Sequence, residues 1–240
     1  MPTNKANFSF NLGSGGVGPV TKILLIAILV LSLGASIGER KFGFGISMLD
    51  FRIDNVLAGE LWRLVTYPFV EGSPFGLILS MIVLWFFGNW FEQRWGARDY
   101  IRFFAISSIG AALLAIPLSY IFNFILPFTD LGVAQGPDAA LDAMLVAMAF
   151  SSADSKILFG FILPMRAKTL VFLLLGIVII FGIQTGAATL SIHVGGMIAG
   201  YLLVTGKWRP SYLISKIRRQ QKQRRSRGLY VVPPRDRTLN

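Results

Sequence analysis

Six apolar stretches, separated by polar or charged residues, follow one another along the 240-residue chain. They cover approximately residues 23–38, 75–91, 101–122, 139–150, 170–183 and 190–205. A helix needs about 20 apolar residues to cross a bilayer, or somewhat fewer when a flanking lysine reaches the headgroups. The fourth stretch is the weakest, because it is short and carries Asp142, so a hydropathy window alone could count five. The pattern predicts an all-α polytopic membrane protein.

The basic residues favour six spans over five. If both termini are cytoplasmic, the inner side of a six-span protein holds eight Lys and Arg residues before position 207 and the eleven from Lys207 onward, which is 19 of the 23 in the chain. Cytoplasmic segments usually carry this excess, and five spans would place the basic tail outside. We therefore expect a flexible polar N-terminus (1–19), a six-helix membrane domain (20–206) and a polybasic, mostly disordered cytoplasmic tail (207–240).

Composition supports a membrane protein and narrows its partners. Apolar residues make up 54% of the chain and charged residues 15%, with a mean hydropathy of +0.62, which is too apolar for a soluble domain. The absence of cysteine excludes disulfides and thiolate metal ligands. Most of the net charge of +11 lies in the tail beside a span, so we expect anionic lipid as its partner and no nucleic acid. We also expect no metal and no cofactor.

The first predicted outer loop, residues 39–74, mixes apolar and charged side chains. Such a segment either lies at the membrane interface or folds back on the bundle. Within it, the indole of Trp62 is suited to anchoring at the headgroup level, and the guanidinium of Arg63 can bind phosphate or cap a helix end. We expect either ordinary anchoring or a specific structural role for this pair.

The only histidine, His193, lies in the last apolar stretch among small residues. On a helix it shares a face with Gly196 and Gly200, so a neighbouring helix can approach closely beside an ionisable ring. Asp138 and Asp142 share one face of the fourth stretch at a similar depth. We expect His193 to pair with one of them, and we favour Asp142 because Asp138 lies nearer the outer surface, where it can meet water. Structural pairing, proton transfer and ion binding all stay open, as does a ring satisfied by a backbone carbonyl.

Four motifs resemble the rhomboid family of intramembrane serine proteases, from about residue 60 to 205. They are ELWRLVTYPFV, LWFFGNWFEQRWG, SADSKILFGFILPMRAK and HVGGMIAGYLL, in that order. The resemblance implies a six-helix bundle with an outward-facing, water-accessible cavity and a serine at the start of the fourth helix paired with a sixth-helix histidine. His193 matches that histidine. The serine position holds Asp138, and the two polar oxyanion positions hold Gly76 and Ser80.

These departures predict a catalytically inactive rhomboid-like protein that binds transmembrane segments or membrane-protein clients. Acyl transfer needs a hydroxyl nucleophile and oxyanion donors, and a carboxylate supplies neither. One alternative is an active rhomboid-type serine endopeptidase with an unrecognised nucleophile, or a carboxylate-based intramembrane hydrolase. Another is proton or ion handling through Asp138, Asp142 and His193. The compact chain suggests a bacterial cytoplasmic membrane.

Overall fold

The structure is a computed structural model that describes residues 16–126, 128, 131–151, 156–159 and 163–206. Its contacts divide the chain into two units, Met1–Val204 and Thr205–Asn240. Most of the predicted N-terminal segment, up to residue 15, lies outside the described residues, and so does the predicted basic tail from residue 207 onward.

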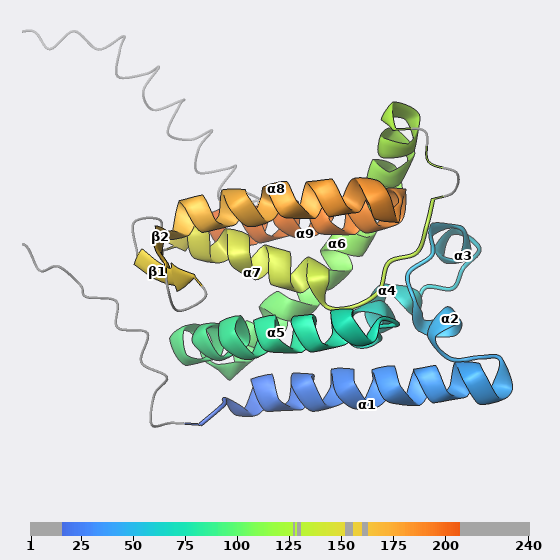
Figure 1. The fold of residues 1–240 in the computed structure, drawn as a ribbon, viewed down its shortest axis with the longest axis horizontal. Coiled ribbons are helices and arrows are strands. Elements are labelled where there is room, and N and C mark those ends of the chain that lie inside the picture. Colours follow the sequence, from blue (N-terminus) through green and yellow to red (C-terminus); the bar gives the residue numbers. More distant parts are fainter. Residues whose placement is uncertain (1–15, 127, 129–130, 152–155, 160–162, 207–240) are drawn as a thin grey trace, which may run out of the picture. The chain divides into compact units, whose positions relative to one another are not determined.

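In the described part of the chain, six long helices occupy the six predicted stretches (Figure 1). They are α1 (Pro19–Phe42), α5 (Pro74–Trp95), α6 (Ala97–Ile125), α7 (Asp138–Ser151), α8 (Ala167–Thr185) and α9 (Ala187–Thr205). Their ends follow local sequence. Gly43 closes α1 in the left-handed conformation, with φ of 72°. The Ser73 hydroxyl caps α5 by accepting from the Gly76 amide at 3.2 Å.

Four of these helices are long and apolar enough to cross a membrane, judged over the described residues: α1, α5, α6 and α9. α7 has only 14 residues, and the described apolar part of α8 is the shorter stretch Gly176–Thr185. The chain is therefore a mostly helical membrane protein. The count of six spans and the orientation of the termini stay predictions.

The short helix α7 forms the centre of the bundle. It lies between α5 and the α8–α9 pair (Figure 1), and every side chain of residues 139–149 is buried. A helix that is apolar on all sides packs inside a bundle rather than at its surface. Other parts of the protein, and not lipid, therefore surround Asp142.

The predicted outer loop folds back on the bundle, which is one of the two arrangements expected for it. It forms α2 (Ile46–Leu49), α3 (Ile53–Leu57), α4 (Arg63–Thr66) and the 3₁₀ turn η1 (Tyr67–Phe69). Four of its buried side chains cluster with the alanines Ala111, Ala112 and Ala115 of α6; they are Phe51, Ile53, Val56 and Tyr67. The Tyr67 hydroxyl also donates to the Ser108 carbonyl at 2.8 Å, so the loop is fixed to α6 by both apolar and polar contacts.

The start of α1 is capped by a side chain from another helix. The buried Glu92 carboxylate, near the end of α5, accepts from the amides of Val20 and Thr21 at 2.9 and 2.8 Å and from the Thr21 hydroxyl at 2.8 Å. A carboxylate at a helix N-terminus satisfies unpaired amides and interacts favourably with the helix dipole. Glu92 therefore ties the ends of α1 and α5 together.

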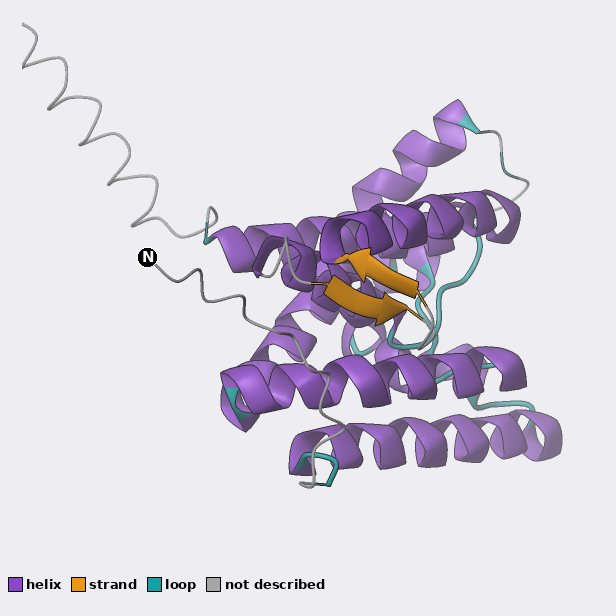
Figure 2. Ribbon diagram, turned by 60° about the vertical axis from the view of Figure 1, so that its left-hand side comes forward, coloured by secondary structure: helices purple, strands orange, loops and turns teal. Residues whose placement is uncertain are grey.

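A two-stranded antiparallel hairpin lies between α7 and α8, where the prediction of an all-α protein included no strand. Strand β1 (Lys156–Phe159) pairs with β2 (Leu163–Arg166), with Lys156 opposite Arg166. Figure 2 shows these strands in orange among helices. A short apolar run cannot be distinguished from the end of a helix by periodicity alone, so the hairpin was not foreseen within the otherwise helical prediction.

Candidate functional site

The two aspartates of the site lie in the first two turns of α7, whose start is held by the outer loop. Gly136, with φ of 84°, makes the bend before the helix. Its amide donates to the carbonyls of Tyr67 at 3.0 Å and Val70 at 2.8 Å. Asp138 is the first residue of α7. Asp142 follows one turn later and so lies on the same face.

His193 of α9 contacts Asp142, as predicted from their matched depth. The imidazole Nδ1 lies 2.6 Å from Oδ2 of Asp142. The exposed fractions of the two side chains are 15% and 7%. This is a short hydrogen bond, as contacts between an imidazole and a carboxylate often are. Polar groups with so little exposure to water need such a partner.

Small residues allow α7 and α9 to come this close. A side-chain carbon added at Gly200 would lie 2.5 Å from the Ala143 carbonyl oxygen, and one added at Gly196 would lie 2.8 Å from the Ala139 Cα and closer still to its oxygen. Both contacts are with backbone, which cannot move aside as a side-chain end can. The two glycines therefore have the close-packing role predicted for them.

The other two positions singled out from the sequence, Ser80 and Gly76, both lie on α5. The Ser80 hydroxyl lies 3.3 Å from Oδ1 of Asp138 and donates to it. Gly76 brings no side chain and instead lies beside Glu71, whose Oε1 would be 2.9 Å from a side-chain carbon at that position. The structure thus brings together Ser80, Asp138, Asp142 and His193.

Glu71, an acidic residue of the predicted outer loop, is a further member of this neighbourhood that the sequence did not single out. Its carboxylate also faces Gly136, at the start of α7. The pKa of Glu71 is raised above the usual glutamate value, mainly because burial disfavours the charged form and also because Asp138 is near. The sequence shows an acidic residue shortly before the start of α5, which could indicate contact with that helix. It does not indicate that the side chain also reaches the start of α7.

The arrangement offers acid, base and hydrogen-bonding groups but no activated hydroxyl. Of the four residues that the structure brings together at this site, only Ser80 has a hydroxyl. That hydroxyl donates to the Asp138 carboxylate rather than to the imidazole. Among the described residues there is also no group of three His, Asp or Glu side chains placed to hold a metal ion. The geometry suits proton sharing and polar contacts more than nucleophilic attack.

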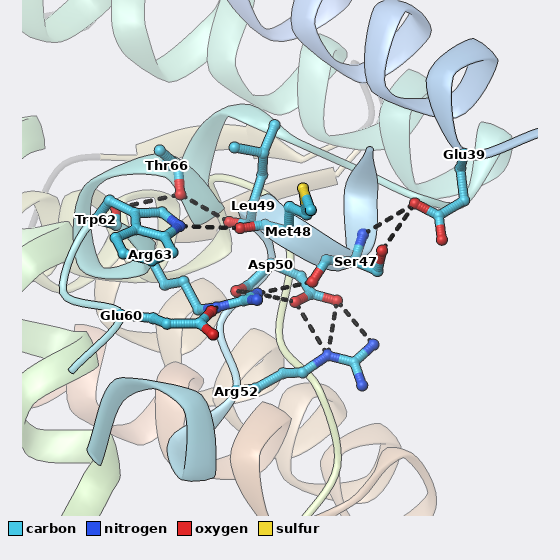
Figure 3. A network of polar contacts seen from close by, with 10 residues as sticks. All are labelled: Glu39, Ser47, Met48, Leu49, Asp50, Arg52, Glu60, Trp62, Arg63 and Thr66. Atoms are coloured by element: carbon cyan, nitrogen blue, oxygen red, sulfur yellow. Dashed lines mark hydrogen bonds and ion pairs between the residues drawn. The ribbon is translucent and has the colours of Figure 1, made fainter. Parts of the chain in front are cut away.

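Trp62 and Arg63 have structural positions within the outer loop. Figure 3 shows the Arg63 guanidinium pointing into the loop, where Nη1 donates to the Ser47 carbonyl, the Asp50 carbonyl and Oδ1 of Asp50, at 2.7 to 2.8 Å. Its Nε donates to Glu60 at 2.6 Å and lowers the pKa of that carboxyl. The guanidinium thus binds carbonyls at the end of α2, which is the capping role, and its protein partners leave it buried rather than facing lipid phosphate.

The indole of Trp62 is half exposed and donates to the Met48 carbonyl at 3.1 Å. Its exposed ring fits anchoring, while its N–H supports the same loop as Arg63 (Figure 3). The hydrogen bonds of the pair support a structural role in the loop, and anchoring of the exposed Trp62 ring at the membrane interface stays a prediction.

Comparison with known proteins identifies the family. A family model described as "Eukaryotic integral membrane protein (DUF1751)" matches residues 22–204. The chain belongs to this family. It is a rhomboid-like family, and the chain is also similar to the curated proteins named "Rhomboid protease GlpG" of Salmonella paratyphi A and Salmonella typhi. Each is 30% identical over 93 residues, which is 38% of this chain.

The match spans only a third of the length of these curated relatives, 33%. It supports the rhomboid-like relationship, but it does not bring the relatives' activity to this chain. The family description is eukaryotic, so the expected bacterial cytoplasmic membrane finds no support. What stands of that expectation is that this rhomboid-like protein is an integral membrane protein.

Proposed function

We propose that this rhomboid-like membrane protein is catalytically inactive toward peptide bonds and binds transmembrane segments of client membrane proteins. The observation that carries the proposal is the identity of the residue that begins α7. A rhomboid nucleophile is expected there, and this chain has Asp138, next to a histidine that is already bound to Asp142 at 2.6 Å.

The chemistry around Asp138 argues against acyl transfer. A carboxylate at the nucleophile position cannot form the ester intermediate of a serine protease, and its charge disfavours an oxyanion beside it. Of the two expected oxyanion positions, Gly76 and Ser80, only Ser80 has a polar side chain. Its hydroxyl donates to Asp138 and is therefore not free to stabilise an oxyanion. Each lost oxyanion donor commonly slows such enzymes by about 10²- to 10³-fold.

The same groups favour binding of a helix that carries a polar residue. Polar side chains at membrane depth bind other polar groups across helix interfaces, because lipid offers no alternative partner. A client segment with a hydroxyl or amide near its outer end could replace part of the contact between Ser80 and Asp138. A purely apolar segment would gain nothing at this site.

Reconstitution in liposomes can test this function. Fluorescent single-span peptides, identical except for Leu or Asn at one position near the outer end, would be added to the labelled protein, and energy transfer would be measured. We expect the Asn peptide to bind more tightly and to stay intact. Equal transfer from both peptides, or their cleavage, would contradict the proposal.

We further propose six spans with both termini cytoplasmic, with residues 20–206 forming the membrane domain and the basic tail lying against anionic lipid. The six helices at the predicted positions and the distribution of Lys and Arg support this topology. Because the chain has no cysteine, single cysteines at Ser73 and Ser226 can report sidedness. An impermeant maleimide should label them from opposite sides, and labelling from one side would exclude six spans.

A further inference from the structure

Residues 70–73, here called the strap, connect η1 to α5 and are bound to two other parts of the bundle. The Glu71 amide donates to the Ser32 hydroxyl of α1 at 2.9 Å. The Gly72 amide donates to Oε1 of Gln135 at 2.9 Å, and the Val70 carbonyl accepts from the Gly136 amide at 2.8 Å. The strap thus spans from α1 to the start of α7.

The Glu71 side chain fills the space that two glycines leave at the starts of α5 and α7. A side-chain carbon at Gly76 would lie 2.9 Å from one carboxylate oxygen of Glu71, and one at Gly136 would lie 2.5 Å from the other. The carboxylate is therefore wedged between two helix ends. Its position fixes how closely the strap lies against them.

This wedge faces groups that act on its charge in opposite directions. Asp138 of α7 is the titratable group that acts on the charge of Glu71. Its carboxyl carbon would lie 4.0 Å from a side-chain carbon added at Gly136, which Glu71 also faces. Deeper on the same side lie Asp142 and His193, which bind each other. The Ser73 amide donates to Glu71 at 3.1 Å, and the α5 and α1 groups nearby are the hydroxyls of Ser80 and Ser32.

Burial and the facing Asp138 carboxylate oppose the charge of Glu71 more than the Ser73 and Gly72 amides favour it. Donors and helix N-termini favour a carboxylate charge, whereas burial and a like charge oppose it. The raised pKa of Glu71, with burial as its largest cause, shows which side prevails. Neutral Glu71 is better suited to the wedged position than ionised Glu71.

We propose that protonation of Glu71 controls the strap: neutral Glu71 keeps it docked between α5 and α7, over the Asp138 end of the candidate site, and ionised Glu71 releases it. The direction follows from linkage, since the docked state binds the proton more tightly than the released state. Docking is complete at low pH and is lost as pH rises from the usual glutamate range through the docked-state pKa of Glu71.

A single cysteine can report strap release in the full-length protein in detergent. Val70 is 1% exposed, so Val70→Cys should react with maleimide only when the strap lifts. The exposed position Ala58 gives a reference cysteine, Ala58→Cys, that cancels the thiol's own dependence on pH. We expect the ratio of the Val70→Cys rate to the Ala58→Cys rate to rise severalfold between pH 5 and 8, because ionisation of Glu71 opposes docking.

Two variants in the Val70→Cys background make the result specific. Glu71→Gln keeps the shape of the neutral form, so its ratio should stay at the low-pH value throughout. Asp138→Asn removes the facing charge, so the rise should move to lower pH. A flat wild-type ratio, or an unchanged rise in Glu71→Gln, would overturn the proposal. If Glu71→Gln does not purify folded, an unmoved rise in Asp138→Asn would overturn it equally.

Discussion

Removal of the contact between Asp142 and His193 should show how strongly it holds α7 to α9. The two atoms lie 2.6 Å apart, and neither side chain is more than 15% exposed. Asp142→Leu leaves the imidazole without its partner, and His193→Phe leaves a buried carboxylate. Breaking one side of such a buried pair typically costs about 3 to 5 kcal/mol.

The double variant should cost less than the sum of the single variants, because two apolar side chains of similar volume leave no buried polar group unpaired. We expect a coupling of about 1 to 3 kcal/mol. The free energy of unfolding would be measured for all four proteins by adding SDS to mixed micelles while following helicity. Equal slopes of the transitions would confirm that the same unfolding is compared.

A matched cycle controls for general damage to the packing of α9. Ser191 is buried on the same helix, and its hydroxyl has no hydrogen-bond partner in the described residues. Asp142→Leu combined with Ser191→Ala should therefore be additive within about 0.5 kcal/mol. Additive effects in the Asp142–His193 cycle as well would refute the pairing, and the histidine would then be a ring satisfied by backbone.

Three further changes test separate parts of the structure. Gly196→Ala should lower the free energy of unfolding by about 1 to 3 kcal/mol, because the new methyl meets the Ala139 backbone. Gly34→Ala places its methyl in open space and should not lower it. Equal effects of both variants in the SDS titration would refute close packing. Arg63→Met should cost about 3 to 5 kcal/mol by leaving buried acceptors unpaired, and a loss below about 1 kcal/mol in the same assay would show that the loop does not need it. Asp138→Ser alone should give no measurable cleavage of a transmembrane substrate, and robust cleavage would show that the oxyanion positions suffice.

Local sequence properties predicted the helices and one long-range contact. Apolar length placed all six helices but not all of their ends. α1 continues past the predicted residue 38 to Phe42, where Gly43 ends it, and α5 begins at Pro74, after the Ser73 cap. The contact between Asp142 and His193 was predictable because each residue lies three positions into its predicted apolar stretch, 139–150 or 190–205, and beside small residues. Depth along a helix can be counted from sequence, so two groups at equal depth on packed helices can be paired.

The rest depends on loops, whose course the sequence does not determine. Glu71 reaches α7 only because the strap crosses from α1 and because Gly76 and Gly136 leave space. From the sequence, the Arg63 guanidinium could bind phosphate or cap a helix end. The carbonyls at the end of α2 lie around it, so it caps that helix. Contacts made through several irregular turns carry no periodic signal.

The most direct test of the central claim is proteolysis by the purified full-length protein. It would be reconstituted with a fluorogenic transmembrane substrate, and a parallel sample would be treated with a fluorophosphonate probe. We expect neither cleavage nor labelling, because Asp138 stands where a serine nucleophile is expected and the Ser80 hydroxyl donates to it. Cleavage that is lost in His193→Ala, or a probe attached to a serine of this chain, would contradict it.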